Sequence, residues 1–188
     1  MFPRLRRAGA QACGGVAAML LASCSVMPPA DVKLDVPYIS TPDEVVAEML
    51  HLAKVGPGDF LYDLGCGDGR IVISAAQRYG TRGVGVDIDS RRVADAVAAA
   101  RAAGVADRVR FVKQDLFETD FSEASVVTLY LLPELNARLK PRLLALRPGT
   151  RVVSHSFGIA GWLPEASAEV EVRGDVYRLY LWIVPQAR

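Results

Sequence analysis

Short apolar runs alternate with helix-like segments through most of the chain, and this alternation limits the possible folds more than any other feature. Five of the runs have strand length and read FLYDLG, GVGVDID, VRFVKQD, VVTLYLL and TRVVSHSF. Helical patterns precede the first run and follow the first, second and fourth. Strands that are apolar on both faces and alternate with helices form parallel sheets with helices on both faces. We therefore predict an α/β fold with a Rossmann-like, mostly parallel sheet.

The two ends of this pattern carry further signals. The segment AEVEVRGDVYRLYLWIV holds two alternating runs around Arg173, Gly174 and Asp175, which is typical of an antiparallel hairpin. Before the first strand, Thr41 is a candidate N-cap and Pro42 suits the first position of a helix. The predicted sheet is thus preceded by a helix and ends in a C-terminal antiparallel hairpin.

Composition fits one domain. The chain has 188 residues, of which 51% are hydrophobic, enough for one core and too few for two ordinary domains. Its 22 Lys and Arg nearly balance 21 Asp and Glu, so charge does not favour a nucleic-acid partner. No Cys/His cluster has the spacing of metal ligands. We expect a monomer that binds neither nucleic acid nor metal.

The first residues have the order of a secretory signal. Three arginines are followed by an apolar stretch and by LASC, which ends at Cys24 and resembles a bacterial lipobox. The stretch is shorter than a spanning helix needs. We expect a lipoprotein-type signal peptide over 1–23, a linker and N-terminal arm over 24–40, and a membrane tether through lipidated Cys24. A short uncleaved anchor and a mis-assigned start are the alternatives, and an accidental motif would leave the chain cytoplasmic.

The turn after the first strand is rich in glycine. Gly65, Gly67 and Gly69 alternate in DLGCGDGR, where a strand meets a helix, so the backbone can approach a ligand closely. A P-loop would end in Gly-Lys-Ser/Thr, and a dinucleotide loop would read G-x-G-x-x-G. Asp63 and Asp68 would repel a phosphate. The loop therefore favours a ligand with a cationic group and no phosphate.

Two more acids end the next two strands. Asp87 closes GVGVD and suits the hydroxyls of a ribose, and Asp115 closes VRFVKQD, where a carboxylate can accept from an adenine amino group. Parallel strands bring these positions and Asp63 to one edge of the sheet. Each acid also has a structural interpretation, as a turn cap for Asp63, a helix cap for Asp87 and a solvated loop acid for Asp115.

YDLGCGDGR, GVGVDID and VRFVKQDLFE, in this order, resemble the first three motifs of class I S-adenosylmethionine-dependent methyltransferases. The resemblance covers about residues 58 to 184 and implies a seven-stranded sheet whose last strand inserts antiparallel. It implies S-adenosylmethionine as cofactor, with Asp63 near its amino group, Gly65 and Gly67 beside its methionyl part, and Asp87 and Asp115 at the ribose and adenine. It also places Cys66, Ile88 and Leu116 among the cofactor-binding positions.

A narrower resemblance extends on both sides of these motifs. DVPYISTPDEVVAEML, TLYLLPELNARLKPRLL and GTRVVSHSF are similar to the small protein-lysine methyltransferases typified by the mitochondrial ATP synthase c-subunit lysine methyltransferase and its bacterial relatives. The similarity implies methyl transfer to a protein lysine by the domain spanning residues 41–188. Tyr38 and Thr41 then become candidates for a lid over the cofactor, or for an arm that packs on the domain with Thr41 as helix cap.

The acceptor is expected beside the segment YLLPELN. Its polar groups Tyr130, Glu134 and Asn136 are candidate catalytic residues, although Glu134 also suits the positive end of the following helix. His155 at the end of TRVVSHSF is a candidate base or a structural histidine. The segment lacks the Asn/Asp-Pro-Pro-aromatic motif of enzymes that methylate amide or base nitrogens. A small-molecule acceptor and a membrane-tethered, non-catalytic cofactor-binding lipoprotein remain alternatives.

Overall fold

A computed structural model describes residues 39–186. The predicted signal peptide over 1–23, Cys24 and Tyr38 lie outside the described residues. Within this range the four helices are α1 (Asp43–Leu52), α2 (Arg70–Tyr79), α3 (Ser90–Ala102) and α4 (Pro133–Leu144). The seven strands of the described part are β1 (Phe60–Leu64), β2 (Arg82–Asp87), β3 (Val109–Lys113), β4 (Val126–Leu129), β5 (Arg151–His155), β6 (Ala166–Val172) and β7 (Asp175–Ile183).

All seven strands join one sheet in the order β3-β2-β1-β4-β5-β7-β6. The first five strands are mutually parallel, and β7 lies antiparallel between β5 and β6. Each parallel strand therefore ends at the same edge of the sheet. The order reverses at β1, because β2 lies on one side of it and β4 on the other. Open α/β sheets bind their ligands at such a reversal, beside the carboxyl ends of the strands.

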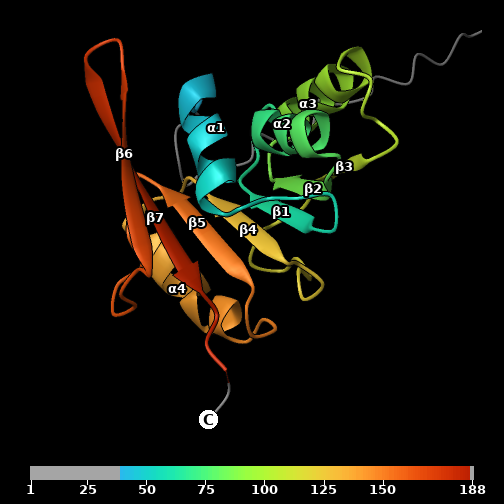
Figure 1. The fold of residues 1–188 in the computed structure, drawn as a ribbon. Coiled ribbons are helices and arrows are strands. Elements are labelled where there is room, and N and C mark those ends of the chain that lie inside the picture. Colours follow the sequence, from blue (N-terminus) through green and yellow to red (C-terminus); the bar gives the residue numbers. More distant parts are fainter. Residues whose placement is uncertain (1–38, 187–188) are drawn as a thin grey trace, which may run out of the picture. The chain divides into compact units, whose positions relative to one another are not determined.

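The C-terminal hairpin forms as predicted. Strands β6 and β7 are joined by Arg173 and Gly174, both with positive φ, at 54° and 91°. Two left-handed residues give the loop the twist of the flanking strands, which is the geometry of a type I′ hairpin turn. Figure 1 shows the hairpin rising beside α1 at the edge of the sheet. The predicted mostly parallel sheet with an antiparallel hairpin is confirmed.

Helices cover both faces of the sheet, as expected. Helices α1, α2 and α3 pack on one face, and α4 lies on the other (Figure 1). Apolar side chains fill a core on each side. The core under α1 and α2 includes Val46, Leu50, Leu61, Val72, Val153 and Leu181, and the core under α4 includes Leu64, Val86, Leu129, Leu139, Leu143 and Trp182. None of the helices within residues 39–186 is both long and apolar enough to span a bilayer.

The start of α1 differs from the prediction. The helix begins at Asp43 with Pro42 as its N-cap, and no described side chain caps it. The predicted N-cap role of Thr41 is therefore wrong by one position. Its hydroxyl lies instead 3.1 Å from Nδ1 of His155, at the end of β5. This contact joins residues 114 positions apart, so local helix signals could not predict it.

Candidate functional site

A cavity of about 240 Å³ opens where β1, β2, β3 and β4 end. A water molecule takes only about 30 Å³ of liquid volume, so the space suits an organic ligand. Ten of the residues predicted to bind the cofactor or to act on the acceptor line it: Thr41, Asp63, Gly65, Cys66, Gly67, Asp87, Ile88, Asp115, Leu116 and Tyr130. Glu134 and Asn136 are not among the lining residues, and Tyr38 is outside the described range.

Asp63 is the most deeply buried acid of the cavity. Its side chain is 2% exposed, and its Oδ1 accepts a hydrogen bond of 2.8 Å from the Thr128 hydroxyl. Burial, followed by the charges of Asp87 and Asp68, raises the pKa of Asp63 to about 7, against the lowering effect of Thr128. None of the described cations contributes to this balance. The ionised carboxylate is thus poorly compensated by the described residues, and a cationic ligand group would stabilise it.

The loop after β1 wraps closely around the cavity. Its backbone turns at Gly65 with φ of 86°, and a Cβ there would lie 2.9 Å from a methyl carbon of Leu131. The positive φ therefore favours glycine at this position, and a Cβ would in addition require the Leu131 side chain to shift. Gly69 forms the left-handed N-cap of α2. The loop presents backbone to the cavity at the N-terminal end of a helix, as the glycine pattern indicated.

Asp87 holds this loop in place. Its Oδ2 accepts a hydrogen bond of 2.8 Å from the Gly67 N–H, and its Oδ1 accepts one of 2.9 Å from the Asp89 N–H. The predicted alternative, a helix cap at Asp87, is wrong, because Asp89 caps α3 by accepting from the Arg91 N–H. The Asp87 carboxylate is fixed at the cavity with lone pairs left for further donors.

Asp115 stands just beyond β3. One of its oxygens accepts a hydrogen bond of 2.8 Å from the Phe117 N–H, so the acid organises its own turn, as a local carboxylate commonly does. It also lines the cavity together with Leu116. The structural and the ligand-binding interpretations of Asp115 are therefore compatible.

The first described residues close one side of the cavity. Ile39, Ser40 and Thr41 belong to its lining. The Arg70 guanidinium donates to the Thr41 carbonyl over 2.8 Å and forms an ion pair with Asp68 of the glycine loop. Arg70 thus links Thr41, just before α1, to the glycine loop. This role of Arg70 was not predicted, because its contact with Thr41 joins residues 29 positions apart.

Tyr130 lies at the other side, within a group of rings. Its ring centroid is 3.9 Å from that of His155 and 6.5 Å from that of Phe157. Tyr130 and Phe157 both line the cavity. Phe157 was not predicted as a site residue, although it ends TRVVSHSF and so follows a parallel strand, which is the signal that identified the acids.

His155 is fully buried and is not among the cavity-lining residues. Desolvation lowers the pKa of His155 to about 4, so its ring is neutral near pH 7. Its Nε2 has no hydrogen-bond partner within residues 39–186. A base of such a low pKa takes few protons at neutral pH. The structural interpretation of His155 is the one that its surroundings favour.

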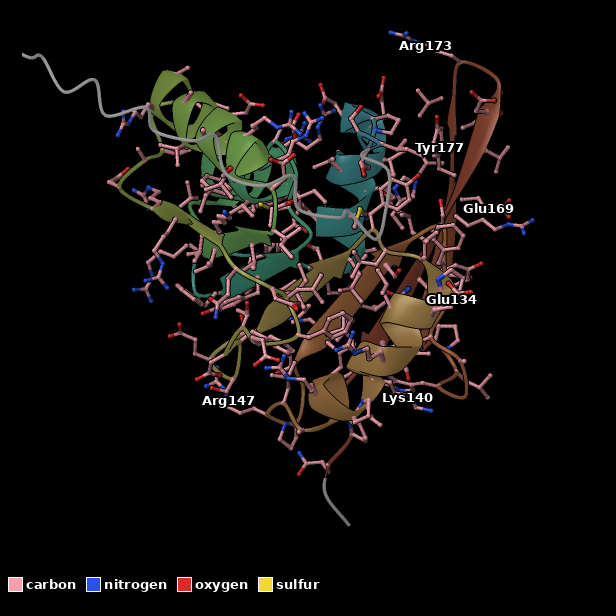
Figure 2. All side chains as sticks on the ribbon, turned by 180° about the vertical axis from the view of Figure 1, so that it is seen from behind. Glu134, Lys140, Arg147, Glu169, Arg173 and Tyr177 are labelled. Atoms are coloured by element: carbon pink, nitrogen blue, oxygen red, sulfur yellow. The ribbon has the colours of Figure 1, made fainter. Side chains whose placement is uncertain are left out.

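Glu134 and Asn136 occupy different places around α4. Glu134 lies exposed in the first turn of the helix, at its positive end (Figure 2). Asn136 is fully buried, and its amide nitrogen donates to the carbonyls of Phe157 and Gly158. Asn136 thereby anchors the turn that carries Phe157. Catalytic roles for these two residues stay predictions, and neither side chain reaches the cavity lining.

The thiol of Cys66 is buried beside the acids of the cavity. Burial, together with the charges of Asp63 and Asp87, raises the pKa of Cys66 far above its usual range. Since the thiolate is the reactive form, the group is inert as a nucleophile. Cys66 contributes a small apolar surface to the cavity and no chemistry of its own.

The predicted cofactor can be tested against these groups. Carboxylates at three strand ends offer acceptors for hydroxyl and amino hydrogens, and Gly65 leaves room that a Cβ would fill. Asp63 is a buried acid whose charged form lacks a described cation. S-adenosylmethionine carries hydroxyls, an amino cation and no phosphate. The residues present therefore fit it.

Comparison with known proteins gives a family and several relatives. A family model, the ANTKMT methyltransferase domain, matches residues 63–166. The chain is 48% identical over 151 residues to a protein-lysine N-methyltransferase of Saccharolobus islandicus (strain REY15A), covering 79% of this chain and 94% of that protein. It is 30% identical over 168 residues to the ATP synthase c-subunit lysine N-methyltransferase of Xenopus laevis, covering 87% of this chain and 74% of the relative.

A solved structure is also similar. It is the crystal structure of an RNA methyltransferase from Salinibacter ruber in complex with S-adenosyl-L-homocysteine. The two chains share 51% sequence identity, with a TM-score of 0.74, over 80% of this chain and 96% of that one. The bound molecule is what S-adenosylmethionine becomes when its methyl group has left.

Proposed function

The chain belongs to the ANTKMT methyltransferase domain family and is a class I S-adenosylmethionine-dependent methyltransferase, and from this premise we propose that it methylates lysine side chains of a protein. The observation that carries the proposal is the match, over 94% of its length, to a protein-lysine N-methyltransferase. The leucine-rich and aromatic lining beside the carboxylates supports it, because such a surface suits the alkyl chain of a lysine.

Bound S-adenosylmethionine supplies an electrophilic methyl group. The work of the protein is to place the lysine nitrogen in line with it and to exclude water. We assign Asp63 to the amino cation of the cofactor, Asp87 to the ribose and Asp115 to the adenine. Leu131, Leu132 and Leu135 line the acceptor side of the cavity and keep it dry.

The lysine must be neutral to attack. Its usual pKa is about 10.4, and transfer from water to an apolar cavity disfavours the ammonium form. The lysine ammonium therefore loses a proton before or while the side chain enters the cavity, and the neutral nitrogen receives the methyl group. None of the acids within residues 39–186 that line the cavity lies on α4 or after β5, so we assign the loss of the proton to desolvation and solvent.

RNA is the competing acceptor, because the similar solved structure is described as an RNA methyltransferase. We favour lysine because charge is balanced, with 22 Lys and Arg against 21 Asp and Glu, whereas RNA-binding domains concentrate positive charge. YLLPELN also lacks the motif typical of base-nitrogen methylation. A small-molecule acceptor and a non-catalytic binding protein are two further outcomes that the test separates.

The test is transfer of radioactive methyl groups from S-adenosylmethionine to a cell extract by the purified full-length chain. Samples are then treated with RNase, with protease, or left untreated, and macromolecules are precipitated. Lysine methylation predicts label that protease releases and RNase does not. Label released by RNase, label that never precipitates, or no incorporation would favour RNA, a small molecule or a non-catalytic role respectively. The Asp87→Ala chain is the control for contaminating enzymes.

We also propose that a lipid on Cys24 holds the enzyme at a membrane, on the strength of the basic start, the apolar stretch and LASC. S-adenosylmethionine is made in the cytosol, whereas a lipoprotein signal directs a chain out of the cytosol. The tether alone therefore does not determine on which side of the membrane the methyltransferase domain lies. Cleavage before Cys24 that globomycin blocks would support the proposal. An uncleaved chain in the soluble fraction would contradict it and place the enzyme in the cytoplasm.

A further inference from the structure

The cavity has two chemically different sides. Asp63 lies in β1, Asp87 ends β2 and Asp115 follows β3. Tyr130, Phe157 and three leucines line the part of the cavity after β4 and β5 and at the start of α4, where none of the described acids lines it. In the strand order β3-β2-β1-β4-β5, the three acids therefore lie along the β3-β2-β1 half of the sheet edge, and Tyr130 and Phe157 lie along the β4-β5 half. The acidic side suits the cofactor, which leaves the side formed by Tyr130 and Phe157 for the acceptor.

The two rings are close enough to act on one group. Their centroids lie 6.5 Å apart, with 22° between the ring planes. A cation is attracted to an aromatic face when it lies within about 6 Å of the ring centroid. One cation at this side of the cavity can therefore lie within range of both rings.

The backbone adopts an uncommon conformation to bring Phe157 to the cavity. The Phe157 N–H donates to the His155 carbonyl over 2.8 Å, which closes a turn around Ser156, whose φ is 63°. A three-residue turn with a positive φ at its centre is the rare, strained form. Strain of this kind persists where neighbouring contacts impose it, and it clusters at ligand-binding sites. Here Asn136 and the Arg178 carbonyl, which accepts from the Ser156 N–H, hold the turn.

The ring of Tyr130 is held in place by its contact with the His155 ring. The His155 ring packs against it in a tilted arrangement, with 3.9 Å between centroids and 33° between planes, and the Thr41 hydroxyl hydrogen-bonds His155. A side chain packed in this way loses little further freedom when a ligand binds. The rings of Tyr130 and Phe157 are thus both in place before the acceptor arrives.

From these observations we propose that the ring faces of Tyr130 and Phe157 bind the acceptor nitrogen and stabilise the positive charge that methyl transfer gives it. This inference rests on the proposed lysine methylation. As the nitrogen–carbon bond forms, the sulfur–carbon bond breaks with its electron pair going to sulfur. The positive charge moves from sulfur to nitrogen.

The attraction to the rings therefore grows along the reaction, and only such an interaction accelerates the chemical step. It also predicts preference for a methylated ammonium. Methyl groups remove hydrogen-bond donors and weaken hydration, whereas ring faces need no N–H group. A quaternary ammonium is the cation that aromatic cages bind in other proteins.

Two small probes test the proposal directly. One is Nα-acetyl-Nε-trimethyllysine amide, and the other is its uncharged analogue with carbon in place of the quaternary nitrogen. Both have the same shape, so a difference in affinity reports the charge. Each is titrated by calorimetry into the full-length chain in detergent, saturated with S-adenosyl-L-homocysteine. The cation is expected to bind about 3- to 30-fold more tightly than the neutral analogue.

Variants assign the preference to the rings. Phe157→Leu should reduce the preference to less than about 3-fold, because it weakens binding of the cationic probe and leaves binding of the neutral probe unchanged. Phe157→Tyr and Tyr130→Phe each keep a ring and should retain the preference. Affinity for S-adenosyl-L-homocysteine checks that each variant folds. Equal affinity of the two probes, no binding of the cation, or an equal loss for both in Phe157→Leu would overturn the proposal. Failure of the lysine assignment would appear separately, as label in RNA or small molecules.

Discussion

The hydroxyl of Thr128 donates a hydrogen bond of 2.8 Å to Oδ1 of Asp63 across the paired strands β4 and β1. This neutral donor does not offset the burial and the neighbouring acids, so the pKa of Asp63 is raised to about 7. The site is therefore electrostatically unfavourable until a cation enters. The charge of Asp63 should accordingly affect both the stability of the protein and its affinity for the cofactor.

Asp63→Asn should stabilise the protein without ligand at pH 8. A pKa raised above the unfolded value of 3.8 means that the ionised form is less favourable in the folded state. Above pH 7 the acid therefore reduces the free energy of unfolding, by up to about 4 kcal/mol. The reduction fades as the pH falls from 7 towards 4. Thermal melts at pH 8 and pH 4 should show a higher Tm for the variant at pH 8 only.

The same variant should lose cofactor binding, since Asn cannot neutralise an amino cation. Function and stability thus oppose each other at this position, as they do at other functional sites. Thr128→Val is the matched control, because it removes the hydrogen bond but keeps the charge. An Asp63→Asn chain that still binds S-adenosylmethionine with unchanged affinity would refute the role of Asp63.

Binding of S-adenosylmethionine should depend on pH below neutrality. If the amino cation of the ligand pairs with the ionised form of Asp63, Asp63 must lose its proton when the ligand binds below pH 7. The affinity for S-adenosylmethionine then falls by up to about tenfold per pH unit below 7. Calorimetry between pH 5.5 and 7.5 measures this slope. The slope should vanish in Asp63→Asn, to the extent that residual binding can be measured. A flat wild-type profile would contradict the assignment.

Asp87→Ala should weaken cofactor binding by on the order of 1.5 to 3 kcal/mol, the range for hydrogen bonds to a charged group. It also removes the acceptor for the Gly67 and Asp89 N–H groups, so the glycine loop loses a support. Asp87→Asn keeps one acceptor oxygen and should show a smaller loss. Equal affinity in wild type and Asp87→Ala would remove Asp87 from the binding site.

His155→Phe should retain methyl transfer if the ring serves as packing. It should also change acid stability. Because the pKa of His155 falls to about 4 from a usual 6.5, the unfolded chain binds the proton first, and stability decreases as the pH drops from about 6.5 to 4. In His155→Phe the free energy of unfolding should therefore fall less between pH 7 and pH 4.5 than in the wild type, as measured by urea unfolding at the two pH values. Loss of transfer in a folded His155→Phe chain with unchanged cofactor affinity would instead support a catalytic histidine.

Much of the fold could be predicted because its signals are local. Each strand and helix has its own periodicity, and the hairpin follows from the two alternating runs around Arg173, Gly174 and Asp175. The cavity-lining positions of Asp63, Asp87 and Asp115 follow equally, since parallel strands end at one edge. That one rule therefore predicts where the three acids lie.

The rest depends on contacts that sequence spacing does not reveal. Thr41 hydrogen-bonds His155, which is 114 positions away in the sequence. A residue whose type and position suggest a helix cap therefore contacts the end of β5 instead. The left-handed Ser156 is not a glycine, and nothing in its type signals the turn that presents Phe157. Asn136 was a candidate catalytic residue of YLLPELN, yet it is buried and donates to the Gly158 carbonyl, a contact between residues 22 positions apart.

Lysine methylation by this chain is measured as radioactive methyllysine in acid hydrolysates of protein that has been incubated with labelled S-adenosylmethionine and the full-length chain. We expect methyllysine to carry the label, and Asp87→Ala to form at least about tenfold less of it at limiting cofactor. Label confined to other compounds would exclude lysine as the acceptor, and an undiminished yield with Asp87→Ala would exclude Asp87 from cofactor binding.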